Sequence, residues 1–149
     1  MKVIGSRQRR CIDGPGDKIV LIIRRLRCAV CHRIHHELPD MLVPYKRHIR
    51  ESIEAVVGGD PALSVTADES TLWRWRRWFW ALAAYFLGCL TAIAARYAIA
   101  SAEVRSTLTR SALHGIRQLV GEAPGWLARV VRPVVNTNLW VQTRSAFLS

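Results

Sequence analysis

Apolar and polar positions in the first 27 residues follow the pattern of a β-hairpin. Residues 2–10 form a short basic segment, and residues 18–23 form an apolar run rich in β-branched side chains. Between them, residues 13–17 read Asp-Gly-Pro-Gly-Asp, a strong turn signal, because glycine supplies a positive φ and proline fixes its own. The arginine-rich residues 24–27 extend the second strand. The pattern therefore predicts a hairpin at the start of the chain.

A helical period replaces the strand pattern after a proline-bounded connector. Between residues 45 and 57 the apolar positions recur at spacings of three and four, with charged residues on the other faces. Pro44 is well placed as the first residue of this helix, where its missing N–H is not needed. Gly58 and Gly59 would end it. We expect a helix over 45–57.

Further helices are predicted along the rest of the chain. One begins near Asp68, a residue suited to capping a helix N-terminus, and runs through tryptophan-rich and then alanine-rich sequence to residue 95. Residues 101–120 place apolar side chains three and four apart, which predicts an amphipathic helix. Glycines at 121 and 125 interrupt this pattern, and residues 126–131 are long enough for one more short helix.

The charge balance favours a polyanionic partner. The 149 residues carry 22 Lys/Arg against 11 Asp/Glu, a net charge of +11, and residues 1–50 alone hold 12 Lys/Arg against 4 Asp/Glu. All but three of the cations are arginine, whose guanidinium makes bidentate contacts to phosphate and guanine. Nucleic acid or an anionic membrane surface is the partner that this composition indicates.

Soft metal ligands gather in the first third of the chain. Cys28 and Cys31 form a Cys-x-x-Cys knuckle, and His35 and His36 follow directly. A structural zinc site takes four Cys or His ligands. One of the histidines could supply the third, and Cys11 the fourth, because Cys11 falls on the partner strand of the hairpin. The alternative is a knuckle of ordinary reduced thiols without metal. Zinc is the cofactor that the pattern indicates.

Cysteine usage and the N-terminal sequence also bear on localisation. The first residues are charged and contain no apolar core, so no secretory signal is expected. In a reducing compartment a Cys-x-x-Cys pair more often binds metal or does redox work than forms a structural disulfide. No strand–helix–strand pattern surrounds the pair, which argues against a thioredoxin-like role. These observations favour a cytoplasmic protein.

The helix after Asp68 opens with the composition of a DNA-recognition helix. Two short hydroxyl residues precede three arginines, and the helix over 45–57 would pack across it. In such an arrangement the first residues of the recognition helix face base edges, and its arginines reach phosphates. The alternative is an amphipathic helix whose tryptophans fill a core while the arginines are merely solvated. We predict DNA contacts from Lys46, Arg47, Ser70, Thr71, Arg74, Arg76 and Arg77.

An uncharged run allows a different interpretation of the same helix. Residues 78–95 carry no charge and are flanked by arginines. That length is at the lower edge of the ~20 residues that a membrane span needs, and aromatic residues near the ends fit the same topology. A buried core helix explains the run equally well, because six of the 18 residues are alanine.

Signatures of catalysis are lacking in the sequence. The acidic residues form no spaced pair in an apolar setting, and the chain has neither a glycine-rich phosphate loop nor a nucleophile elbow. His114 stands alone on a predicted helix. We therefore expect a protein without enzymatic activity.

Five segments carry a family resemblance. They are Val3-Ile4-Gly5-Ser6-Arg7, Arg24-Arg25-Leu26-Arg27-Cys28-x-x-Cys31, His35-His36-Glu37-Leu38-Pro39-Asp40, Pro44-Tyr45-Lys46-Arg47 and Ser70-Thr71-x-x-Arg74-x-Arg76-Arg77-Trp78. Together they resemble a bacterial family of unknown function that is similar to the zinc-finger and helix-turn-helix front end of insertion-sequence transposases. The resemblance covers about residues 1–97. It implies DNA binding linked to mobile elements, without a catalytic domain in this chain.

The chain departs from the family pattern at its start. In the family a first Cys-x-x-Cys lies just ahead of the Val-Ile-Gly-Ser-Arg stretch, whereas here Met1 stands two residues before Val3. Of the family's ligands only Cys28 and Cys31 carry over, and Cys11 and the two histidines are substitutes suggested by their position. A truncated or accessory mobile-element protein is the expectation that follows.

The sequence thus predicts an α+β fold in three regions. Residues 1–43 would form the β-hairpin and zinc knuckle, residues 44–100 a helical region with helix-turn-helix character, and residues 101–149 a helical extension of unknown role. The predicted function is DNA binding. The alternatives are a membrane-associated protein with a single span near 78–100 and an interaction module that docks on a transposase subunit without binding DNA.

Overall fold

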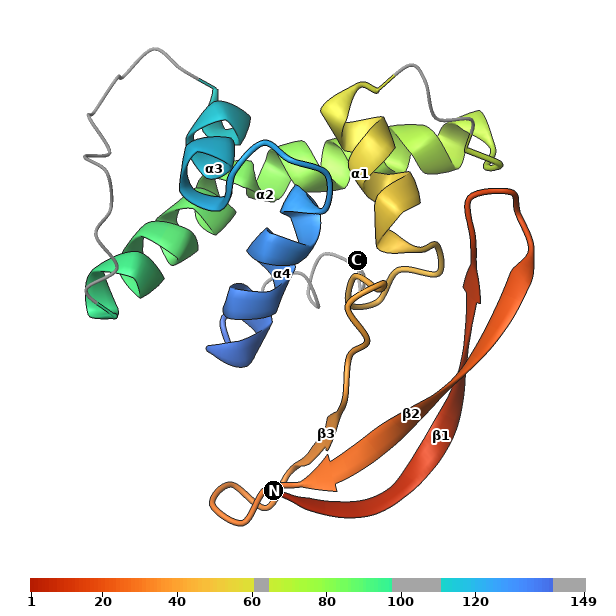
Figure 1. The fold of residues 1–149 in the computed structure, drawn as a ribbon, viewed down its shortest axis with the longest axis vertical. Helices are drawn as coiled ribbons and strands as arrows, with labels where there is room; N and C mark the ends of the chain where they lie inside the picture. Colours follow the sequence, from red (N-terminus) through yellow and green to blue (C-terminus); the bar gives the residue numbers. More distant parts are fainter. Residues whose placement is uncertain (61–64, 98–110, 141–149) are drawn as a thin grey trace. The chain divides into compact units, whose positions relative to one another are not determined.

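The computed structural model describes residues 1–60, 65–97 and 111–140. Contacts divide the chain into two compact units, Met1–Asp68 and Glu69–Ser149. The first unit holds a three-stranded antiparallel sheet and one helix, and the second is helical in its described part (Figure 1). The predicted α+β class is confirmed. The proposed division at residues 43/44 and 100/101 stays a prediction.

The sheet consists of β1 (Lys2–Ile12), β2 (Lys18–Arg27) and β3 (Ile34–His36), in that spatial order. The predicted hairpin is confirmed, and β1 and β2 form a long twisted ribbon with β3 beside one end (Figure 1). In the turn, the Asp13 side chain accepts backbone N–H bonds from Gly16 at 2.9 Å and Asp17 at 2.6 Å. β3 was not expected from the sequence. It pairs antiparallel with the last residues of β2.

The first helix begins later than the sequence predicts. Helix α1 spans Arg50–Gly58, and the expected start at Pro44 is wrong. Tyr45 has a left-handed φ of 63°. The backbone that follows binds the hairpin: the Ile12 N–H donates to Arg47 at 2.8 Å, and the Ile49 N–H donates to Ile12 at 2.9 Å. These bonds with the strand replace the first helical turns. The predicted end is confirmed, with Gly59 in a left-handed conformation.

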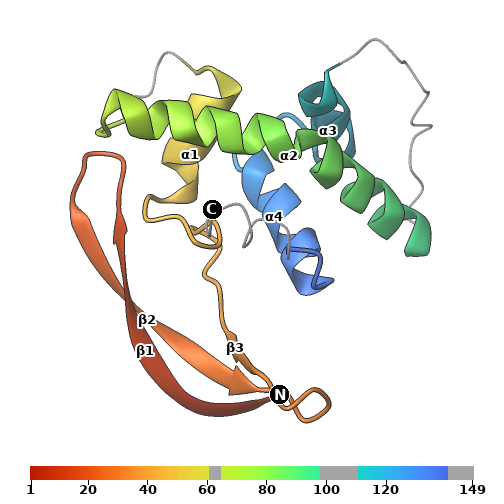
Figure 2. The same ribbon diagram turned by 180° about the vertical axis from the view of Figure 1, so that it is seen from behind.

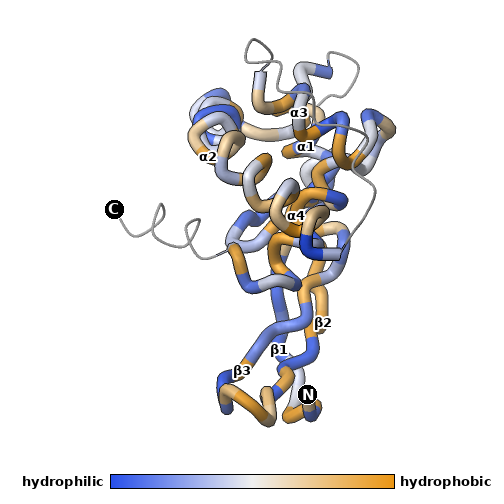
Figure 3. Tube along the Cα trace, turned by 90° about the vertical axis from the view of Figure 1, so that its left-hand side faces the viewer, coloured by the Kyte–Doolittle hydropathy of each residue, from blue (hydrophilic) through white to orange (hydrophobic). Residues whose placement is uncertain are grey.

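The buried apolar residues of the first unit come from all of its parts. Cys11 and Ile23 of the strands are buried, as are Leu42 and Val43 of the connector and Ile53 of α1. Within the ribbon, β2 is rich in hydrophobic residues, whereas most residues of β1 are hydrophilic (Figure 3).

Arg9 fastens the same connector to the sheet. Its Nη2 donates to the backbone carbonyls of Val43 at 3.3 Å and Lys46 at 2.9 Å. Partial burial lowers the pKa of Arg9, and the neighbouring Arg7 lowers it further. This arginine is therefore a structural part of the unit.

The second unit contains α2 (Glu69–Arg96), α3 (Ala112–Val120) and α4 (Trp126–Asn136). Seen from behind in Figure 2, α2 passes in front of the other two helices. The predicted helix after Asp68 is confirmed. For the helix predicted over 101–120, residues 101–110 lie outside the described residues, and the remainder begins at Ala112. Helix α4 continues five residues past the predicted 131, and the additional turn buries Val134.

Aromatic side chains fill the core of the second unit. Phe79 of α2 meets Trp126 of α4 edge-on at 5.5 Å between ring centroids, and Phe86 stacks on Trp140 at 5.2 Å. Both phenylalanines are fully buried. The Tyr85 hydroxyl donates to the Leu139 carbonyl at 2.6 Å. These contacts hold α2 against the C-terminal part of the unit.

Candidate functional site

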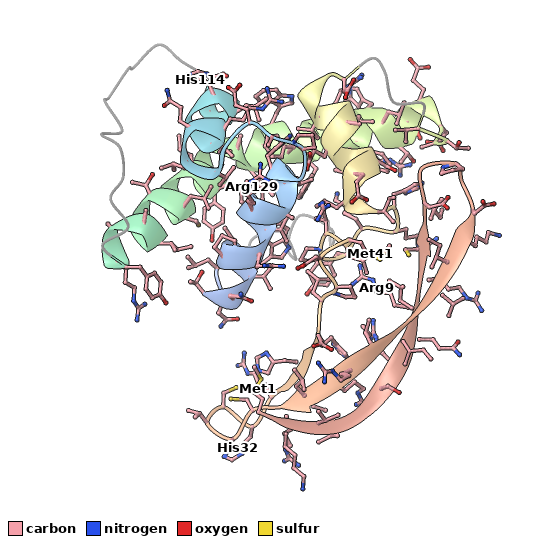
Figure 4. All side chains as sticks on the ribbon, viewed as in Figure 1. Met1, Arg9, His32, Met41, His114 and Arg129 are labelled. Carbon is pink, nitrogen blue, oxygen red and sulfur yellow. The ribbon has the colours of Figure 1, made fainter. Side chains whose placement is uncertain are left out.

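A tight turn follows β2 and forms the Cys-x-x-Cys knuckle. The Cys28 N–H donates to the Arg33 carbonyl at 3.0 Å, and the His32 N–H donates to the Cys28 carbonyl at 3.1 Å, which closes the loop on itself. His32 adopts a left-handed φ of 55° to complete the turn. Met1 and His32 lie at this same end of the hairpin (Figure 4), as the pairing of Lys2 with Arg27 requires.

Strand β3 decides which histidine faces the knuckle. His35 pairs with Leu26 and His36 pairs with Arg25 across the β2–β3 ladder. Successive side chains of a strand point to opposite faces of the sheet. The two adjacent histidines therefore point in opposite directions, and the structure brings only His35 to the cysteines.

Three metal-ligating atoms converge at this end of the sheet. Those of Cys28, Cys31 and His35 all lie within 4.8 Å of one another. The distance from Cys31 Sγ to His35 Nε2 is 3.5 Å. Tetrahedral zinc, with bonds of about 2.3 Å to sulfur and about 2.0 Å to nitrogen, places such ligand atoms about 3.6 Å apart. The chemistry and the spacing of these donors fit a zinc ion.

The backbone also prepares the first cysteine for metal binding. The N–H groups of Cys31 and Val30 donate to the Cys28 sulfur and lower the pKa of its thiol, and the Cys31 N–H lies 3.5 Å from Cys28 Sγ. Hydrogen bonds to a thiolate favour the ionised form, and the thiolate is the form that binds metal. Cys31 is exposed, whereas Cys28 and His35 are half-buried. An ion could reach the cluster directly from solvent.

Cys11 is not brought to this cluster. It pairs with Ile19, eight residues before Arg27 on β2, and at about 3.4 Å per strand residue it lies roughly 27 Å from the knuckle. Cys11 is 1% exposed, and burial raises the pKa of its thiol. It serves as a small apolar residue of the core. The register of the hairpin, which the sequence does not reveal, places it there.

His36 lies on the other face of the sheet, away from the metal-ligating atoms. Burial lowers the pKa of His36, and the positive charges of Arg7, Arg25 and Arg9 lower it further. The sequence pointed to His36 as a ligand only because it stands next to His35. Its surroundings are those of a positively charged surface.

Three of the predicted DNA-contacting residues of α2 are hydrogen-bonded to one another at the start of the helix. The Arg74 guanidinium donates to the Ser70 backbone carbonyl at 3.2 Å and to the hydroxyls of Ser70 at 3.2 Å and Thr71 at 3.0 Å. Arg76 is exposed. Arg77 is exposed as well and lies over the Trp73 ring, 5.2 Å from its centroid.

The two cations predicted ahead of the first helix differ in exposure. Arg47 is exposed. Lys46 is only 7% exposed, which removes it from the surface that DNA could reach. The Lys46 carbonyl accepts from Arg9 and the next carbonyl, that of Arg47, accepts from the Ile12 N–H, so the backbone at this point is held against the hairpin.

Helix α2 is also the candidate for a membrane span. Among the residues that the structure describes, it alone is long and apolar enough to cross a bilayer, with a mean hydropathy of 1.7 over its best 18-residue window. One third of that window, 33%, is buried inside the protein. The core helix of a soluble protein meets the same criteria, so this observation leaves localisation open.

Fold and site together define a small α+β protein with a Cys/His cluster at one end of an antiparallel sheet. Residues 1–75, which include all three strands, α1 and the first turns of α2, match the family described as Domain of unknown function (DUF6431). The chain belongs to this family. Neither the curated proteins nor the solved structures include a match to it.

Proposed function

We propose that this protein binds double-stranded DNA without catalysing a reaction. The observation that carries the proposal is the set of exposed arginines on the first turns of α2: Arg74, whose guanidinium Ser70 and Thr71 hold in place, Arg77 one turn further along, and Arg76 farther around the helix. A guanidinium already ordered by neighbouring hydroxyls loses less conformational freedom when it binds phosphate. The net charge of +11 supports the same partner.

Zinc is the metal that we assign to Cys28, Cys31 and His35. It would hold β3 and the knuckle against the end of β2, where the three strands contribute little apolar burial of their own. Small units with a limited core commonly depend on such a metal for stability. The cluster supplies three of the four ligands that a tetrahedral zinc takes, so the fourth position would be left to water or to a ligand outside the cluster.

The relation to transposase N-terminal regions is part of this proposal. It rests on the five segments quoted above, which include the zinc knuckle and the start of α2. A helix-turn-helix made of α1 and α2 is the arrangement that the resemblance implies. The protein would then act as an accessory or truncated mobile-element protein that binds DNA without its catalytic domain.

Salt dependence of DNA binding tests the assignment of α2. The affinity for a labelled duplex should be measured by fluorescence anisotropy at several salt concentrations for the wild type and for Arg76→Ala/Arg77→Ala. Each lost phosphate contact should reduce the slope of log K against log salt by about 0.9. Arg96→Ala, which removes an exposed charge from the other end of the same helix, is the control. An unchanged slope in the double variant would overturn this assignment.

The membrane alternative rests on the length and hydropathy of α2. Its flanking arginines and terminal aromatic residues agree with a single span. Extraction of cell membranes with alkaline carbonate separates the two functions. A protein that binds DNA and does not span the membrane is released into the supernatant, whereas a spanning protein stays in the pellet.

A further inference from the structure

The three strands of the first unit are uniformly basic. β1, β2 and β3 contain Lys2, Arg7, Arg9, Arg10, Lys18, Arg24, Arg25 and Arg27 and no acidic residue. Arg9 is engaged with backbone carbonyls of the connector. The other cations are distributed over the two faces of the ribbon, and the register of the sheet shows which share a face.

One face of the knuckle half collects most of these charges. Gly5 pairs with Arg25, which in turn pairs with His36 on the other side. Arg7 stands two residues along β1 from Gly5, so it shares the face of Arg25 and lies about 7–8 Å from it diagonally. The next pair on this face is Lys2 with Arg27. We call Lys2, Arg7, Arg25, Arg27 and His36 the basic face.

The opposite face is neutralised at the corresponding place. Arg24, the neighbour of Arg25, donates to the Glu37 carboxylate at 2.6 Å, and this pairing holds the pKa of Glu37 below its usual range. On the basic face His36 occupies the equivalent position beside Arg25. On one face Arg24 therefore has the Glu37 carboxylate as its counter-charge, whereas on the other face Arg25 has His36 beside it instead of an acid.

Arg7 is exposed and Arg25 partly exposed, so a ligand can reach the centre of the basic face. Among the described residues, Arg7 and Arg25 take part in no ion pair. Gly5 leaves bare backbone between them, because a Cβ there would meet no atom within 4 Å. Like charges on neighbouring strands destabilise a sheet. A face that keeps them together without an acid is therefore arranged to receive a counter-charge from outside.

We infer that the basic face, centred on Arg7 and Arg25 around Gly5, contacts the phosphate backbone of double-stranded DNA. This inference rests on the proposed DNA binding and adds a second contact surface to the one on α2. A twisted two-stranded ribbon fits the groove of a duplex, and the guanidinium groups of adjacent strands then reach phosphates. The contact carries no sequence information, because phosphates are alike at every base pair.

The test compares two double variants that lose the same charge from the same hairpin. Arg7→Ala/Arg25→Ala removes the centre of the basic face. Arg10→Ala/Lys18→Ala removes two exposed cations from the opposite face. Anisotropy with a labelled duplex of random sequence, measured over a salt series on the full chain, should show a slope lowered by about 1.8 for the first variant. The second variant should lower the salt slope by less than half of that amount.

Each other outcome overturns the inference in a recognisable way. Equal losses in both variants would mean that only diffuse charge attracts DNA. An unaltered slope in Arg7→Ala/Arg25→Ala, with the α2 variant still impaired, would confine binding to α2. No binding by the wild type would overturn the proposed function as well. Selective loss of binding to phosphatidylserine vesicles, with DNA binding unchanged, would assign the face to a membrane.

A charge-conserving variant separates a folding defect from a lost contact. Arg7→Lys/Arg25→Lys keeps both positive charges on the face and should retain most of the salt slope. The urea midpoint of all variants should be compared, because a fall confined to Arg7→Ala/Arg25→Ala would mean that the arginines support the sheet. A slope that drops in the lysine variant as far as in the alanine variant contradicts a phosphate contact of this kind.

Discussion

At the scale of single residues, the geometry of the cluster of Cys28, Cys31 and His35 depends on two features of the backbone. The alternation of β3 sends His35 toward the cysteines and His36 toward Arg25. The left-handed conformation of His32, with a φ of 55°, closes the turn that carries Cys28 and Cys31. A residue with a Cβ in this conformation is strained by about 1–2 kcal/mol, so a substitution at position 32 changes the stability of the turn.

Substitution of His32 should separate backbone strain from metal binding. His32→Gly relieves the strain, and we expect zinc affinity equal to or above that of the wild type. His32→Val, whose branched side chain resists the left-handed conformation, should weaken zinc binding several-fold. Competition with a chromogenic chelator measures both affinities. Loss of zinc in His32→Gly would show that the imidazole is itself a ligand.

Burial of Cys11 predicts slow modification of its thiol. At pH 7, after a chelator has removed any metal, iodoacetamide should label the exposed Cys31 first and leave Cys11 unmodified in the absence of urea, as read by peptide mass spectrometry. In urea the two thiols should react at similar rates, which is the control. Equal rates in the native state would place Cys11 at the surface and contradict its role in the core.

The raised pKa of Cys11 also gives a direction for pH dependence. A group with a raised pKa in the folded state contributes stability in full below its unfolded pKa, and the contribution is lost as pH rises through the folded pKa. The free energy of unfolding, measured in urea, should therefore decline above about pH 8.5. The decline should be smaller in Cys11→Ala, although the urea midpoint of this variant should itself be lower than that of the wild type. An equal decline in both proteins would assign the effect to other groups.

At the scale of elements, the hairpin holds the connector and thereby delays α1. Arg9 donates to two carbonyls of that connector. We expect Arg9→Ala to lower the free energy of unfolding by about 1–3 kcal/mol, since two hydrogen bonds from a charged donor are lost. Arg10→Ala, the adjacent exposed arginine, should change it by less than about 0.5 kcal/mol. Similar values for both in urea unfolding would remove Arg9 from its structural role.

The elements also show how much of the structure could be predicted from the sequence. The hairpin was predictable because a five-residue turn signal separates two strand patterns, and the knuckle because its cysteine spacing is local. The late start of α1 was not, since it depends on bonds between Ile12 and the connector. Strand β3 has three residues, too few for a pattern, and the exclusion of Cys11 follows from a register that only the folded sheet reveals.

At the scale of the whole molecule, the two units differ in what holds them together. The second unit contains all six tryptophans and an aromatic core. The first has a modest core and the metal-type cluster at the far end of its sheet. Removal of zinc by a chelator should therefore change the far-UV circular dichroism of the sheet while tryptophan fluorescence changes little. A large loss of fluorescence would show that the units unfold together.

The metal content of the purified protein tests the assignment of the cluster most directly. Elemental analysis should find about one zinc per chain in the wild type. His36→Ala should keep it, whereas Cys28→Ala/Cys31→Ala should lose it and His35→Ala should bind it weakly, because only His35 faces the cysteines. A wild-type protein purified without zinc and unable to take it up, or equal losses in the two histidine variants, would contradict a zinc site built from Cys28, Cys31 and His35.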